Sequence, residues 1–128
     1  MRNILAIDIP AILRRGKSVE QFIGRSPDFA GHIRIIELRP SQESIEVWVY
    51  DFEDIGTENF LDLYEFPFAD QDRADNPAAT FSNPESALSF AAESFAADSA
   101  RWVNSGVSES EYLDYIRAGR PSIRAGAA

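Results

Sequence analysis

The sequence of 128 residues contains no cysteine and a single histidine, His32. The absence of cysteine excludes disulfides, thiolate metal sites and cysteine nucleophiles. One imidazole cannot form a histidine-rich metal site, and no neighbouring motif marks His32 as a catalytic base. We therefore expect a structural or surface role for His32, and a protein without a metal, a cofactor or a catalytic residue.

Motifs for nucleotides and calcium are also missing. The seven glycines are isolated, so the sequence contains neither a Walker loop nor a dinucleotide fingerprint. Asp70, Asp72 and Asp75 resemble the start of a calcium loop, but Ala74 occupies its fifth position and Asp75 replaces its glycine. These absences favour a binding protein over an enzyme.

The length and the apolar content predict one folded domain. Apolar residues make up 45% of the chain, which is far above the content of a chain that cannot collapse. The apolar run at 4–13 is interrupted by Asp8 and Pro10 and is too short to span a bilayer. We expect a cytoplasmic domain over residues 1–121 and a frayed tail at 122–128.

Negative charge is concentrated in the middle of the chain. Residues 1–40 carry 7 basic and 4 acidic side chains, residues 41–100 carry 1 and 14, and residues 101–128 carry 4 and 3. The middle part therefore supplies the whole net charge of −9. Such a surface repels nucleic acid and anionic membranes and attracts basic proteins. Solubility alone is the competing explanation.

Local signals predict helices before the first strand. Pro10 suits a first helical turn and Gly16 a helix end, which predicts a short helix between them. Ser18 and Gln21 form a capping-box pattern ahead of Gly24, which predicts a second short helix.

Alternating apolar residues predict three strands, at 32–39, 44–53 and 60–68, the last of them at a sheet edge because of Pro67. Residues 69–82 are polar and acidic, which predicts a loop.

Two further helices are predicted in the C-terminal part. Asn83 is suited to cap the first, along which Leu88, Phe95 and Trp102 recur every seven residues. The second begins with a capping box at Ser108. The predicted fold class is α+β, with an antiparallel meander of three strands or more flanked by N-terminal and C-terminal helices.

Acidic and aromatic residues are interleaved between positions 48 and 75. Most of the rings are needed for the core, whereas the carboxylates are suited to pair with arginine on a basic partner. The predicted partner-binding residues are Asp51, Glu53, Asp54, Glu58, Asp62, Glu65, Asp70, Asp72, Asp75, Tyr50 and Tyr64.

Three stretches, FAAESF at 90–95, RWVNSGV at 101–107 and EYLDYI at 111–116, resemble small immunity proteins of bacterial contact-dependent growth inhibition and related polymorphic-toxin systems. The WVY strand at 48–50, ahead of an acidic loop, fits the same family. The resemblance implies a cytoplasmic monomer that binds one cognate toxin domain, often a basic nuclease such as an RNase, and covers its active site. It assigns no individual binding residue.

Two alternatives stay open. The chain could instead be an acidic regulator that imitates nucleic acid and binds a basic host protein. A hydrolase that depends on a pair of carboxylates is the alternative from the enzyme class, although sequence does not show which two acids would form the pair.

Overall fold

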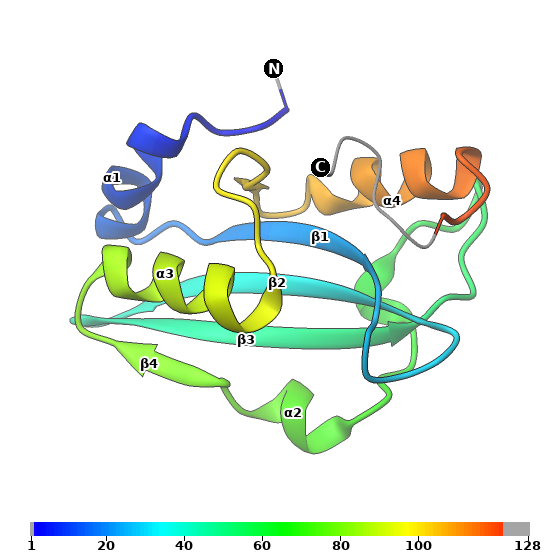
Figure 1. Cartoon of the computed structure of the whole chain (residues 1–128), viewed down its shortest axis with the longest axis horizontal. Coiled ribbons are helices and arrows are strands. Elements are labelled where there is room, and N and C mark those ends of the chain that lie inside the picture. The colour runs from blue at the N-terminus through cyan, green and yellow to red at the C-terminus, as the bar shows by residue number, and fades with distance from the viewer. Residues whose placement is uncertain (1, 122–128) are drawn as a thin grey trace.

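The computed structural model describes residues 2–121, and the predicted frayed tail lies outside them. Five antiparallel strands form one sheet in the order β4-β3-β2-β1-β5 (Figure 1). The elements are η1 (Ala6–Asp8), α1 (Ile9–Arg14), β1 (Val19–Arg25), β2 (His32–Ser41), β3 (Ser44–Glu53), η2 (Leu63–Glu65), α2 (Gln71–Asp75), β4 (Ala79–Phe81), α3 (Pro84–Phe95), β5 (Val103–Asn104) and α4 (Ser108–Arg117). This arrangement confirms the α+β class, with a sheet larger than three strands.

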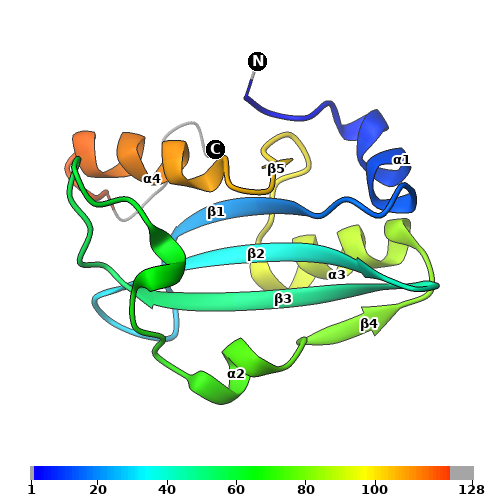
Figure 2. The ribbon, with the colours of Figure 1, turned by 180° about the vertical axis from the view of Figure 1, so that it is seen from behind.

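The sheet separates two apolar cores. Helices α1 and α3 lie on one face, whereas α4 and η2 lie on the other (Figures 1 and 2). Strand β2 is buried on both sides, because Ile36 and Leu38 face the first core while Ile33 and Ile35 face the second. Two apolar faces explain why adjacent Ile35 and Ile36 are both buried and the apolar alternation changes phase between them.

The hairpin of β2 and β3 is the longest pairing in the molecule, and it confirms both predicted strands. Its register runs from His32 opposite Glu53 to Ser41 opposite Ser44. Gln42 takes a positive φ of 54° in the turn between the strands.

The prediction for residues 18–24 is wrong, because Val19–Arg25 forms β1 between β2 and β5. Both faces of this strand are buried, so apolar residues occur on both faces and their spacing resembles that of a helix. Two of the buried side chains are polar. Gln21 bonds the backbone of Asp98, and Glu20 accepts a hydrogen bond from the backbone N–H of Ser108 at 3.2 Å. Partners that distant in sequence cannot be inferred from local spacing.

The predicted third strand at 60–68 is also wrong. This stretch contains the short helix η2. Leu63 and Phe66 of the stretch pack against the face of the sheet that α4 covers. The strand-like pairing of the stretch is limited to two isolated bridges, from Phe68 to Phe52 of β3 and from Phe60 to Thr57. The expected loop at 69–82 instead contains α2 and the edge strand β4.

The helix predictions after residue 82 hold in part. Asn83 caps α3 by accepting a hydrogen bond from the N–H of Ser86 at 2.8 Å, as predicted. The helix ends at Phe95, because Ala96 takes a left-handed conformation with φ of 60°, so Trp102 belongs to the segment before β5.

Helices α1 and α4 are confirmed. The predicted capping box of α4 is not formed, because Ser108 is its first helical residue and its N–H bonds Glu20. Within residues 2–121, no helix combines the length and the apolar character needed to cross a membrane.

Candidate functional site

The predicted binding residues after β3 lie on one long connection, residues 53–75, which we call the acidic segment. It leaves the end of β3, passes beside α4, crosses the sheet at η2 and ends with α2 at the opposite edge (Figure 2). The carboxylates therefore form a strip along this path rather than a compact patch.

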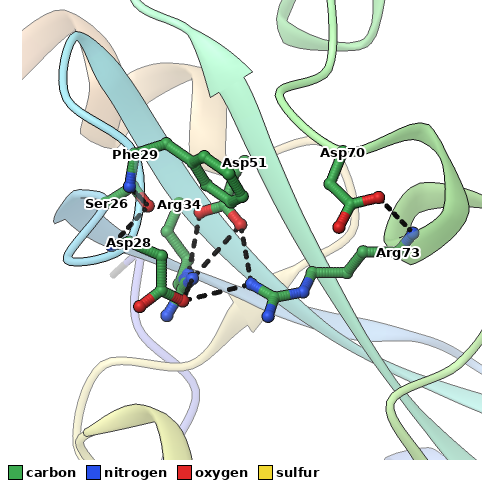
Figure 3. Close-up of polar contacts among 7 residues, drawn as sticks. All are labelled: Ser26, Asp28, Phe29, Arg34, Asp51, Asp70 and Arg73. Atoms are coloured by element: carbon green, nitrogen blue, oxygen red, sulfur yellow. Dashed lines mark hydrogen bonds and ion pairs between the residues drawn. The ribbon is translucent and has the colours of Figure 1, made fainter.

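Asp51 precedes the acidic segment and lies inside the molecule. Its Oδ1 accepts from Nε of Arg34 at 2.9 Å, and its Oδ2 accepts from Arg73 at 3.1 Å. Asp28 joins the same group by contacts of 2.6 Å to Arg34 and 3.2 Å to Arg73 (Figure 3). Two carboxylates and two guanidinium groups thus balance one another, and Asp51 is occupied by bonds within the chain.

This ionic cluster connects Asp51 of β3 with three other parts of the chain. Arg34 comes from β2, Arg73 comes from α2, and Asp28 comes from the loop after β1 (Figure 3). Arg34 and then Arg73 lower the pKa of Asp28, because both guanidinium groups favour its ionised form. The cluster fixes α2 against the sheet.

Asp54 is half-buried and also serves the fold. Its Oδ1 accepts a hydrogen bond from the hydroxyl of Tyr112 at 2.6 Å, and that hydroxyl accepts one from the N–H of Gly56 at 2.9 Å. Arg120 approaches Asp54 at 3.4 Å. Burial, followed by the bond to Asp54, raises the pKa of Tyr112 and keeps its hydroxyl protonated. These contacts hold the start of the acidic segment against α4.

Tyr50 is buried beneath the acidic segment. Its hydroxyl donates to Glu37 at 2.8 Å and accepts from Arg39 at 2.8 Å, and the Arg39 guanidinium lies 4.1 Å from the ring centre of Trp48. Burial and the charge of Glu37 raise the pKa of Tyr50. The contacts of Tyr50 place it in the core rather than on a partner-facing surface.

Tyr64, in contrast, is exposed, and two other large apolar side chains are exposed near it in sequence. The exposed fractions are 45% for Ile55, 44% for Phe60 and 45% for Tyr64. In the described part of the chain, the other exposed large apolar residues are Leu5 and Ile7. Exposed apolar groups are therefore concentrated in the acidic segment.

The remaining predicted carboxylates are exposed, and their contacts within the chain are few. Glu58 pairs with Arg117 at 2.6 Å on the surface, Asp70 caps α2 through the N–H of Arg73, and Asp75 accepts from Gln71. The exposed set is Glu53, Glu58, Asp62, Glu65, Asp70, Asp72 and Asp75. A basic partner could reach all of these side chains.

Two buried carboxylates, Glu20 and Glu37, were missed at the sequence level. They are cross-strand partners in β1 and β2, and each is less than a tenth exposed. The only sequence feature that could have indicated their burial was an acidic residue within an apolar strand. For Glu20 this feature was not visible, because residues 18–24 were predicted to be a helix. Among residues 2–121, no group of three or more acidic or histidine side chains is arranged to hold a metal ion.

No protein-family model, no curated protein and no solved structure matches this chain.

Proposed function

We propose that this protein is a cytoplasmic immunity protein that binds one cognate toxin domain, a basic nuclease, and covers its active site. One observation carries the proposal. The exposed apolar side chains Ile55, Phe60 and Tyr64 lie in the same short stretch as exposed carboxylates such as Asp62 and Glu65. Apolar anchors surrounded by charged groups are typical of protein interfaces.

The two kinds of side chain have different roles in this proposal. A nuclease needs cationic groups to hold phosphates, and the carboxylates of the acidic segment compete for those groups. Long-range attraction accelerates association, whereas the desolvated apolar contacts determine how slowly the complex dissociates.

Most exposed carboxylates are free to exchange partners. The Glu58 to Arg117 pair is about half exposed on both sides, and surface pairs of this kind contribute little to stability. Asp51 and Asp54 hold the segment in place from within. The fold thus presents the outer acids on a fixed support.

The first experiment is co-expression with the protein encoded immediately upstream. We expect rescue of growth and a complex of one chain of each protein, seen by size-exclusion chromatography with light scattering. Failure to rescue and to form a complex would contradict the immunity function. Capture of several unrelated basic proteins would instead favour the acidic regulator.

The second experiment separates the acidic segment from general charge. The variant Asp62→Lys/Glu65→Lys is compared with Glu43→Lys/Glu93→Lys, which makes the same charge change at exposed sites outside the segment. We expect the first to slow association about 10-fold or more, and the second to have a much smaller effect. Equal effects, or an association rate that does not depend on salt, would reject this surface.

A further inference from the structure

We propose that the hollow between the loop after β1 and the end of α4 binds a small organic molecule carrying an oxyanion, either a carboxylate or a phosphate ester. The cavity has a volume of about 590 Å³, within the range common for small-molecule sites. Its lining includes Arg25, Phe29, His32, Tyr115 and Arg120. This site adjoins the start of the acidic segment at Asp54, but the proposal does not depend on the proposed function.

Arg25 supplies the positive charge of the cavity. Its guanidinium donates to the backbone carbonyl of Arg120 at 2.7 Å and interacts with the hydroxyl of Tyr115. Most other arginines in residues 2–121 pair with carboxylates, but none of the ion pairs in that part of the chain involves Arg25. A guanidinium bound only by neutral groups keeps its full charge for an incoming anion.

The two carboxylates that line the cavity do not cancel this charge. Asp28 is bound by Arg34 and Arg73, which belong to the ionic cluster behind the loop. Asp54 accepts a 2.6 Å hydrogen bond from the hydroxyl of Tyr112. Asp54 also pairs with Arg120, another lining residue, at 3.4 Å, so these two charges offset each other and Arg25 remains the uncompensated charge.

The other lining groups define the rest of the ligand. Nδ1 of His32 lies 2.9 Å from the carbonyl of Ala30 and donates there, because a carbonyl oxygen can only accept, and this bond fixes the ring in the cavity wall. Phe29 packs beside His32 with ring centres 6.0 Å apart. Pro27 adds further apolar surface to the same wall. An oxyanion attached to a flat apolar group fits this combination of one uncompensated cation and apolar walls.

The test is a titration of the full chain with benzoate and with phenyl phosphate, followed by amide chemical shifts in NMR spectra. We expect shifts at Ala30 and Gly31 for at least one probe, and the tighter-binding probe identifies the carboxylate or the phosphate class. No shift from either probe, corresponding to a Kd weaker than about 10 mM, would overturn the proposal.

The variants Arg25→Gln and Arg15→Gln give a matched pair, because both arginines are exposed and only Arg25 lines the cavity. We expect Arg25→Gln to weaken binding about 10-fold or more, and Arg15→Gln to leave it unchanged. Equal binding by Arg25→Gln and the unaltered chain would also overturn the proposal. Arg25→Lys keeps the positive charge but loses the planar guanidinium. We expect its affinity for the probe to lie between those of the unaltered chain and Arg25→Gln, which a purely structural role of Arg25 would not produce.

Discussion

Arg34 of β2 and Asp51 of β3 face each other across the central hairpin, with Nε 2.9 Å from Oδ1 and side-chain exposures of 4% and 1%. A charged pair this deeply buried stabilises the fold only while both partners are present. Arg73 and Asp28 complete the ionic cluster and bring α2 and the loop after β1 against the sheet.

Replacing Asp51 should therefore be costly. We expect Asp51→Asn to lower the free energy of unfolding by about 3 kcal/mol, because Arg34 would stay buried without its main counter-charge. The exposed control Asp75→Asn should change stability by less than about 0.5 kcal/mol. Chemical denaturation measures both, and equal losses would contradict the structural role of Asp51.

The ionic cluster also predicts a response to acid. Because Arg34 and Arg73 lower the pKa of Asp28 below 3.8, the folded chain binds this proton less tightly than the unfolded chain. The stabilisation is therefore fully present above that pH and is lost as the pH falls through the lowered pKa. Unfolding measured over this acid range should show a shallower pH dependence for Asp28→Asn, and an unchanged slope would contradict the pairing.

Tyr50 and Tyr64 should respond differently to loss of the hydroxyl. Tyr50→Phe removes a donor to buried Glu37, and we expect a loss of about 1 to 3 kcal/mol in stability. Tyr64 as a whole residue is 45% exposed, and its ring keeps its contacts with Tyr50 and Phe52 in the variant, so Tyr64→Phe should stay within about 0.5 kcal/mol. If thermal unfolding of the two variants shifts equally, the assignment of Tyr50 to the core would be wrong.

Any side chain at position 56 is predicted to destabilise the fold, because there is no space for a Cβ atom at Gly56. A Cβ there would collide with the ring of Tyr112 and would lie 2.8 Å from the carbonyl of Phe60, so Gly56→Ala should cost about 3 kcal/mol. Gly16→Ala is the control, because its φ of +84° is strained but the space around it is open, and about 1 kcal/mol is expected. A smaller loss at Gly56 than at Gly16 would contradict the close approach of this segment to α4.

Sequence patterns predicted the fold class and the central hairpin because these depend on local alternation and turn residues. The pattern failed for Val19–Arg25, where Glu20 and Gln21 are buried against residues far along the chain. It failed again at 60–68, where apolar side chains of a connection pack onto the sheet without joining it. Both failures have the same cause, since apolar periodicity reports burial and not hydrogen bonding.

The candidate site was predicted more coarsely. Charge counting located the acidic segment, but it could not separate Asp51, which lies inside the ionic cluster, from exposed acids such as Glu65. Arg34 carried no sequence signal as the counter-charge, since the pairing depends on the register of β2 and β3. The cavity beside Arg25 was likewise invisible, because it forms between segments far apart in the sequence.

The two outer strands of the sheet have a consequence for self-association. β4 has three residues and β5 has two, so little unpaired backbone is offered to a second copy of the chain. The N-terminal segment shortens the β5 edge further, since Asn3 bridges Val103 and the N–H of Ile4 bonds the carbonyl of Trp102. Short edge strands limit edge-to-edge pairing with a second chain, so we expect the sheet to resist growth into fibrils.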